Sequence, residues 1–82
     1  MLTLYYKPTC PFSQDVLIDA DVYGMSFDLK DVTDSTLEAE LIEKGGRDQT
    51  PFLVDSETGV MLYESQVIID YLHQQYLPLN SS

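Results

Sequence analysis

Cysteine is nearly absent from the 82-residue chain, which contains only Cys10. One cysteine excludes a disulfide within the chain and any metal site built from several cysteines of one chain. We therefore expect no bound metal. Small secreted domains usually carry several disulfides, so the scarcity of cysteine favours a reducing, cytoplasmic setting.

Positive charge is also scarce, because four Lys and Arg residues stand against fourteen Asp and Glu, for a formal net charge of −10. Such a surface repels phosphate backbones and anionic lipids. No apolar run approaches membrane-spanning length, and the opening MLTLYYK is too short for a signal peptide. We expect a soluble, cytoplasmic monomer that binds neither nucleic acid nor membrane.

The residues that are present suffice for one core. The apolar fraction is 44%, and six Tyr and three Phe supply the aromatic side chains. A chain of this length lies near the lower limit for folding without disulfides or metals. We therefore predict a single domain over residues 1–82, without internal repeats or linkers.

Periodicity and turn residues predict seven elements in the order β-α-β-α-β-β-α. A helix beginning at Phe12 has apolar residues on one face, and the final helix is expected to begin with Ser65 as its N-cap. The predicted ranges are a strand at 2–6, a helix at 12–23 closed by Gly24, a strand at 26–32, a short helix around Leu37, Leu41 and Ile42 closed by Gly45 and Gly46, a strand after Pro51, a strand at 60–63, and a helix from Ser65 to Tyr76 before Pro78, with a frayed tail at 79–82.

This order predicts an α/β fold with a four-stranded mixed sheet flanked by three helices. The first strand-helix-strand unit makes two parallel strands, and the final hairpin adds two antiparallel ones. In such sheets, ligands bind beyond the carboxyl end of a strand, where the next helix begins. Cys10 stands at that point of the first crossover.

Cys10 occurs in the stretch KPTCPFS, residues 7–13. The N–H groups and dipole of a helix N-terminus favour a thiolate, and Lys7 adds a cation, so we expect a lowered pKa and a reactive sulfur. The alternative is a small buried apolar residue, the usual state of a free cysteine. The proline that follows Cys10 suits the first helical position and favours the reactive interpretation.

Three motifs follow one another along the chain: KPTCPFS, Thr50-Pro51 before an apolar strand, and Glu64-Ser65 at the start of the last helix. In this order they resemble the motifs of glutaredoxins and of the glutathione-binding N-terminal domain of glutathione transferases. The resemblance covers residues 2–77 and implies a thioredoxin-like (glutaredoxin) fold. Ser13 stands where dithiol glutaredoxins have a second cysteine, so only a monothiol mechanism is possible.

The resemblance also implies a glutathione site. Thr50-Pro51 would be a cis bond, with the Thr50 backbone facing the cysteinyl unit of glutathione. Glu64 and Ser65 would hold the γ-glutamyl ammonium and carboxylate, although Ser65 is equally explained as a simple N-cap.

The other end of glutathione, the glycyl carboxylate, is assigned to Lys7, Arg47 and Gln49, with a solvated loop charge as the alternative for Arg47. Phe12 either shields the thiol or belongs to the core. His73 is expected to be structural or solvated rather than catalytic. The acidic residues Asp15, Asp19 and Asp21 are expected to form a solvated helix face.

Two function classes follow. The leading hypothesis is a glutathione-dependent monothiol oxidoreductase, in which Cys10 reduces glutathione mixed disulfides of proteins or small molecules and glutathione is the co-substrate. The alternative is a transferase-like glutathione-binding or protein-interaction module with little turnover. Iron–sulfur cluster binding is disfavoured by Pro11, because cluster-binding monothiol glutaredoxins carry glycine there.

Overall fold

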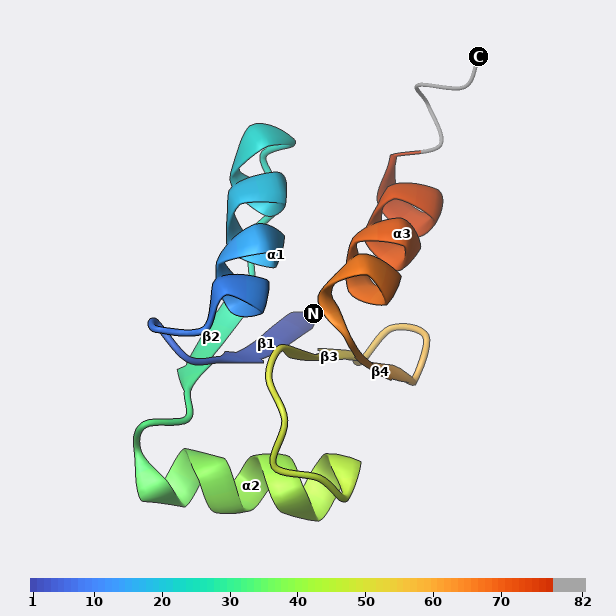
Figure 1. Cartoon of the computed structure of the whole chain (residues 1–82). Coiled ribbons are helices and arrows are strands. Elements are labelled where there is room, and N and C mark those ends of the chain that lie inside the picture. The colour runs from blue at the N-terminus through green and yellow to red at the C-terminus, as the bar shows by residue number, and fades with distance from the viewer. Residues whose placement is uncertain (78–82) are drawn as a thin grey trace.

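The computed structural model describes residues 1–77, which fold into four strands and three helices (Figure 1). The predicted order β-α-β-α-β-β-α is confirmed. The elements are β1 Leu2–Tyr6, α1 Pro11–Val22, β2 Asp28–Asp31, α2 Ser35–Gly45, β3 Phe52–Asp55, β4 Val60–Tyr63 and α3 Ser65–Tyr76.

The four strands form one mixed sheet in the order β2-β1-β3-β4. β1 pairs parallel with β2 and antiparallel with β3, and β3 pairs antiparallel with β4. The predicted crossover and hairpin are therefore both confirmed. β2 is shorter than the predicted 26–32 strand, because its pairing with β1 begins only at Asp28, opposite Thr3.

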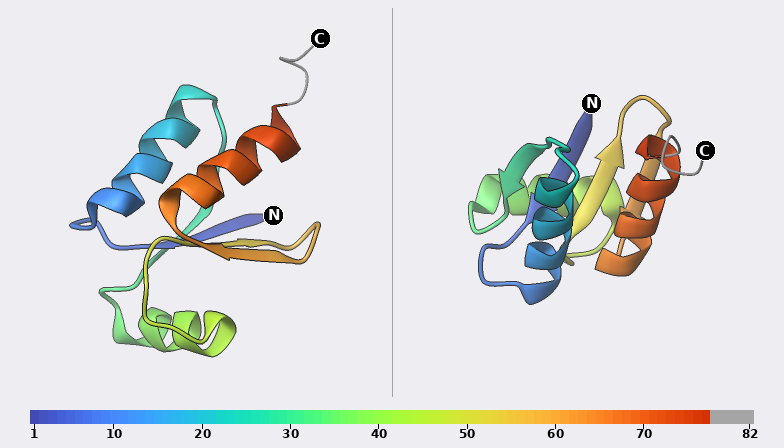
Figure 2. Two further views of the ribbon diagram at one scale, coloured as in Figure 1. Left: turned by 45° about the vertical axis from the view of Figure 1, so that its right-hand side comes forward. Right: turned by 90° about the horizontal axis from the view of Figure 1, so that it is seen from above.

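The helices cover both faces of the sheet. Figure 1 and the two views of Figure 2 show α1 and α3 side by side on one face and α2 alone on the other. In Figure 1, α1 and α3 run in the same direction, so both start close to the sheet. The fold therefore places two helix N-termini at the same end of the molecule.

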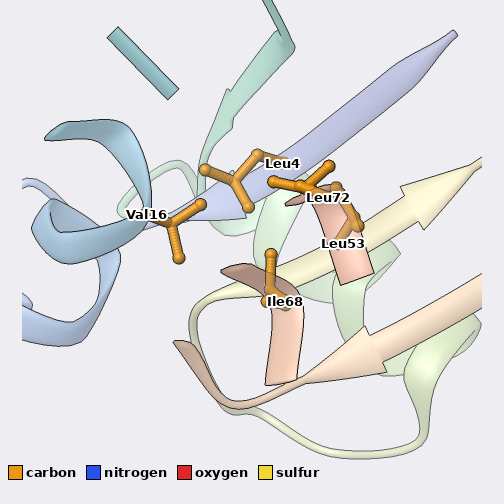
Figure 3. Packing of buried hydrophobic residues seen from close by; sticks show 5 residues of the cluster. All are labelled: Leu4, Val16, Leu53, Ile68 and Leu72. Carbon is orange, nitrogen blue, oxygen red and sulfur yellow. The ribbon is translucent and has the colours of Figure 1, made fainter. Parts of the chain in front are cut away.

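The core divides along the two sheet faces, as the period-two geometry of strands requires. Leu4 and Leu53 are paired across β1 and β3 and pack with α1 and α3 (Figure 3). Their neighbours Tyr5 and Phe52 are also paired and lie in the second cluster, on the α2 side, with Leu41. Adjacent residues of one strand thus pack into the two core clusters on opposite faces of the sheet.

Most helix boundaries agree with the sequence, but one predicted cap is wrong. Ser65 is the first residue of α3, and Glu64 occupies the N-cap position with φ 74° and ψ 126°. α2 ends at Gly45 and Gly46, as predicted, and Gly46 has the left-handed conformation. The predicted stop at Pro78 and the frayed tail at 79–82 lie outside the described residues.

Candidate functional site

The Cys10 thiol lies at the beginning of α1. Cys10 is the N-cap residue, its backbone N–H donates to the Lys7 carbonyl at 3.0 Å, and Pro11 opens the helix. The neutral thiol makes no capping hydrogen bond, so the N–H groups of Phe12 and Ser13 in the first turn of α1 are free to stabilise a thiolate. Cys10 is only partly buried, which contradicts the interpretation as a buried apolar residue.

Hydrogen bonds at this helix start lower the pKa of Cys10. Burial acts in the opposite direction, but donors from the Thr50 side chain, from the Ser13 N–H and hydroxyl, and from the Phe12 N–H outweigh it. The Lys7 ammonium is not among these causes, so its expected part in lowering the pKa is not supported. Ser13 is itself fully buried and accepts a hydrogen bond from the Lys7 backbone N–H at 3.3 Å.

Thr50 touches the sulfur in two ways. Its carbonyl accepts a long hydrogen bond from Cys10 Sγ at 3.8 Å, which favours the protonated thiol, whereas its side chain favours the thiolate. The Thr50–Pro51 peptide bond is cis, as the resemblance implied. The thiol is thus bordered by the segment before β3, 40 residues away in the sequence.

A cavity of about 250 Å³ lies next to this contact. Six of the eight predicted glutathione-binding residues line it. The lining consists of Phe12, Gln49, Thr50, Pro51, Glu64, Ser65, Gln66 and Val67. Phe12 is 59% exposed, so its assignment to the core is wrong, and its side chain lines the cavity instead.

The start of α3 forms one wall of this cavity. Glu64 is the only residue other than glycine with positive φ among residues 1–77, a conformation that costs about 1–3 kcal/mol. Its side chain makes no capping hydrogen bond, so the N–H groups of the first turn, which includes Gln66 and Val67, are not bound by a cap. An open helix N-terminus is a suitable site for a carboxylate.

Lys7 and Arg47 are not part of the cavity lining. Lys7 is half-buried in the loop before Cys10, and Arg47 stacks on the ring of Tyr63, with the guanidinium carbon 4.3 Å from the ring centroid. The Tyr63 hydroxyl also donates to the Arg47 carbonyl at 2.9 Å and accepts from its N–H at 3.1 Å. This contact needs Gly45, because a Cβ there would collide with the Tyr63 hydroxyl.

Sequence reasoning missed Gln66 and Val67 as lining residues. Their signal was present, because they follow Glu64-Ser65 in the first turn of a helix assigned to carboxylate binding. It also missed a buried carboxylate, Asp55, which accepts hydrogen bonds from the hydroxyls of Tyr71 (2.6 Å) and Tyr76 and from the Glu57 N–H (3.0 Å). These donors lower the pKa of Asp55 although burial acts to raise it.

The expectation that Asp15, Asp19 and Asp21 form one solvated face of α1 is wrong for Asp19. Asp19 is partly buried, and its carboxylate lies 2.8 Å from Nε2 of His73 on α3. The His73 ring also packs edge-on against Tyr23. His73 therefore joins α1 to α3, which agrees with the structural role expected for it.

The family model for the glutathione S-transferase N-terminal domain matches residues 4–78. The chain belongs to this family. The match spans the thiol, the cis-proline segment and the start of α3, and it confirms the resemblance to transferase N-terminal domains. Glutathione transferases use glutathione as a substrate.

Solved structures of the family share the fold. A delta-class glutathione transferase of Nilaparvata lugens is 32% identical and superposes with a TM-score of 0.77, over 93% of this chain and 36% of its own. Glutathione S-transferase 1-6 of Anopheles dirus species B is 29% identical, with a TM-score of 0.76, over 90% of this chain and 35% of its own. The chain thus spans about a third of the length of these relatives.

None of the helices within residues 1–77 is long and apolar enough to cross a membrane. In the same range, no three His, Cys, Asp or Glu side chains are grouped as metal ligands.

Proposed function

We propose that the cavity between α1, the Thr50-Pro51 segment and α3 binds glutathione. The γ-glutamyl carboxylate would meet the open N–H groups and hydroxyl at the start of α3, and Glu64 would pair with the ammonium. The cysteinyl unit would lie along Thr50, next to Cys10. Gln49 lines the cavity and would serve the glycyl end, with Lys7 and Arg47 as outer cations.

The reaction that this geometry supports best is monothiol disulfide exchange at Cys10. The observation that carries the proposal is the position of the sulfur, at an uncapped helix start and 3.8 Å from the Thr50 carbonyl that borders the cavity. A thiolate is the nucleophile in thiol–disulfide exchange, and the lowered pKa of Cys10 raises its fraction at neutral pH.

The reaction has two exchanges. The Cys10 thiolate attacks the glutathionyl sulfur of a mixed disulfide; a Cys10–glutathione disulfide forms, and the substrate thiolate leaves and takes a proton from water. A second glutathione thiolate then attacks the glutathionyl sulfur on Cys10. This step releases oxidised glutathione and restores the Cys10 thiolate, so two glutathionyl units leave as one disulfide and the substrate is reduced.

Turnover of a glutathionylated peptide, with glutathione and a glutathione reductase system, tests the reaction. Cys10→Ser should reduce the rate to the uncatalysed background while still binding glutathione in an NMR titration. Ser56→Ala, at an exposed serine in the β3–β4 turn, is the matched control and should keep full activity. Equal rates for wild type and Cys10→Ser would refute the proposal.

A transferase-like role is the second candidate, and the family match favours it. In that case the bound glutathione thiol would attack an electrophile, and Cys10 would form no mixed disulfide. The same preparation should then conjugate glutathione to an aryl halide without reducing the glutathionylated peptide. Mass spectrometry of the protein after reaction separates the candidates, because only the exchange reaction leaves glutathione on Cys10.

The remaining expectations belong to the same proposal. The substrates would be glutathionylated proteins or small disulfides, and the protein would work as a monomer made of one domain. A reducing compartment such as the cytoplasm would supply the glutathione that the second exchange consumes.

A further inference from the structure

The turn that precedes α1 carries Cys10. The Cys10 N–H donates to the Lys7 carbonyl at 3.0 Å, which closes a β-turn over residues 7–10 with Pro8 in its second position, where the fixed φ of proline fits. The Cys10 carbonyl accepts from the Gln14 N–H at 3.1 Å, which is the first hydrogen bond of the helix. The place of the sulfur therefore depends on how this turn is held against α1.

Two neighbouring side chains of α1 hold the turn. The hydroxyl of the buried Ser13 accepts a hydrogen bond from the Lys7 N–H at 3.3 Å. The Gln14 side chain donates from Nε2 to the Pro8 carbonyl at 3.0 Å, the usual length of such a bond. Only the nitrogen of an amide side chain can donate to a carbonyl, so this partner fixes which way the Gln14 amide faces. The first turn of α1 thus binds the β-turn at two points.

The Pro8 carbonyl belongs to the central peptide of the β-turn, between Pro8 and Thr9. The two common turn types differ in the orientation of this peptide, and type II requires a positive φ at the third residue. Thr9 does not have a positive φ, which would be unfavourable for its β-branched side chain. Rotation of the central peptide would turn the Pro8 carbonyl away from Gln14, so the hydrogen bond opposes that rotation.

Packing contributes little to holding this turn. Pro8 and Thr9 are exposed, and neither belongs to a core cluster. The N–H groups and the hydroxyl that stabilise the Cys10 thiolate, by contrast, come from the first turn of α1 and from Thr50. A displacement of the β-turn would therefore move the sulfur relative to all of these donors.

We propose that Gln14 is a positioning residue for the exchange reaction at Cys10. Its hydrogen bond to the Pro8 carbonyl holds the 7–10 turn in one orientation and so keeps Sγ between the start of α1 and Thr50. Gln14 is not part of the cavity lining and acts through the turn. Position matters because a nucleophile displaced by about 1 Å loses much of its rate. The effect on turnover rests on the proposed function, whereas the effect on the thiol does not.

The simpler explanation is that Gln14 only stabilises the start of the helix. The two explanations differ in what they require of the folded protein. If Gln14 only stabilises the fold, its loss lowers the free energy of unfolding and leaves the reactivity of the folded thiol unchanged. If Gln14 positions the turn, the folded protein itself has a less reactive sulfur.

Gln14→Met removes the donor and keeps a similar side-chain length and helix propensity. We expect kcat/KM for a glutathionylated peptide to fall about twofold to tenfold, the range that one ordinary hydrogen bond supplies. The pH midpoint of Cys10 alkylation by iodoacetamide should rise by at least about 0.3, a twofold change in the thiolate fraction. The affinity for glutathione in an NMR titration should not change, since Gln14 does not line the cavity.

A second variant and a matched control separate the hydrogen bond from other effects. Gln14→Glu has almost the same shape, but its ionised carboxylate cannot donate, so the loss should be at least as large as in Gln14→Met. Gln75→Met, at an exposed glutamine late in α3, should keep both the turnover and the midpoint of the wild type. Circular dichroism and urea denaturation establish that each variant is folded in the assays.

Three results would overturn the proposal. The first is wild-type turnover together with an unchanged midpoint in folded Gln14→Met. The second is a loss in Gln14→Glu alone, which would assign the effect to charge. The third is a loss of glutathione affinity as large as the loss of turnover, which would assign Gln14 to ligand binding.

Failure of the proposed function gives a different result. In that case the wild type itself would not reduce the glutathionylated peptide, whatever stands at position 14. The alkylation midpoint would still decide whether Gln14 positions the thiol. A raised midpoint in Gln14→Met, with Gln75→Met unchanged, would support the positioning role, and an unchanged one would refute it.

Discussion

The three helices of this protein begin in two different ways. α2 has a conventional start, in which the Asp34 carboxylate accepts a hydrogen bond from the Thr36 N–H at 2.8 Å. α1 and α3 start at Cys10 and Glu64, whose side chains make no capping hydrogen bond. The uncapped starts border the cavity, and the capped one is on the opposite face of the sheet (Figure 1).

The two ends of α3 also differ in whether their polar groups are hydrogen-bonded. At its start the polar groups are open, whereas towards its end Tyr71 and Tyr76 donate to the buried Asp55. The buried Asp55 carboxylate and its hydrogen bonds therefore lie at the end of α3 away from the cavity. The cavity end keeps donors free and holds a strained Glu64, which is typical of binding sites.

The largest expected effect on stability comes from the end of α3 where Tyr71 and Tyr76 donate hydrogen bonds to Asp55. Asp55→Ala should lower the free energy of unfolding by about 3 kcal/mol, because three donors lose a buried acceptor. Urea denaturation measures this, with exposed Asp21→Ala as the neutral control. Since the folded-state pKa of Asp55 is lowered, its contribution is present above the unfolded-state pKa of about 3.9 and is lost as the pH falls through the folded-state value.

At the capped start, Asp34→Ala should lower the free energy of unfolding by about 1 kcal/mol, the usual cost of losing an N-cap. The affinity for glutathione should not change, because α2 lies on the other face of the sheet. Chemical denaturation and an NMR titration check the two parts. A weaker glutathione affinity in this variant would break the contrast between capped and open starts.

At an open start, Glu64→Gly should raise the free energy of unfolding by roughly 0.5–1 kcal/mol, because glycine adopts positive φ without steric cost. The same change should weaken glutathione binding, since it removes the carboxylate assigned to the ammonium. Glu57→Gly, at an exposed glutamate in the β3–β4 turn, serves as the comparison and should leave binding unchanged. Tighter binding by Glu64→Gly would contradict the assigned role.

The smallest change concerns the Cys10 sulfur itself. The rate of alkylation by iodoacetamide should rise with pH through a midpoint below that of an ordinary cysteine thiol, because only the thiolate reacts and the pKa of Cys10 is lowered. Ser13→Ala should move this midpoint upwards, since it removes a hydrogen bond that favours the thiolate. Lys7→Ala should leave the midpoint in place. A shift in Lys7→Ala alone would reassign the cause to the ammonium.

Much of the fold could be predicted, because its signals are local. Apolar and aromatic runs such as residues 2–6, and the glycine at 46, mark strands and helix ends whatever the rest of the chain does. The thiol and the Thr50-Pro51 segment were found in the same way, from short motifs. The roles assigned to the glutathione-binding residues remain predictions that the proposed experiments test.

What could not be predicted depends on contacts between distant residues. The partners of Asp55 lie 16 and 21 residues away on α3, and the partner of Asp19 lies 54 residues away. No local pattern distinguishes these aspartates from solvated ones. Glu64 is a similar case, because its positive φ is imposed by the turn between β4 and α3 and not by its own preference.

Tyr63 links two segments of the chain that lead to the cavity lining. Its hydroxyl hydrogen-bonds to the backbone N–H and carbonyl of Arg47, two residues before Gln49 and Thr50 in the cavity lining. On the other side, Tyr63 is followed directly by Glu64 and Ser65, which also line the cavity. The hydroxyl of one tyrosine therefore connects two segments of the chain, at Arg47 and Tyr63, which are 16 residues apart in sequence. The space that this ring occupies exists only because position 45 lacks a side chain, so a methyl group added there would collide with the Tyr63 hydroxyl and disturb this link, although neither residue lines the cavity.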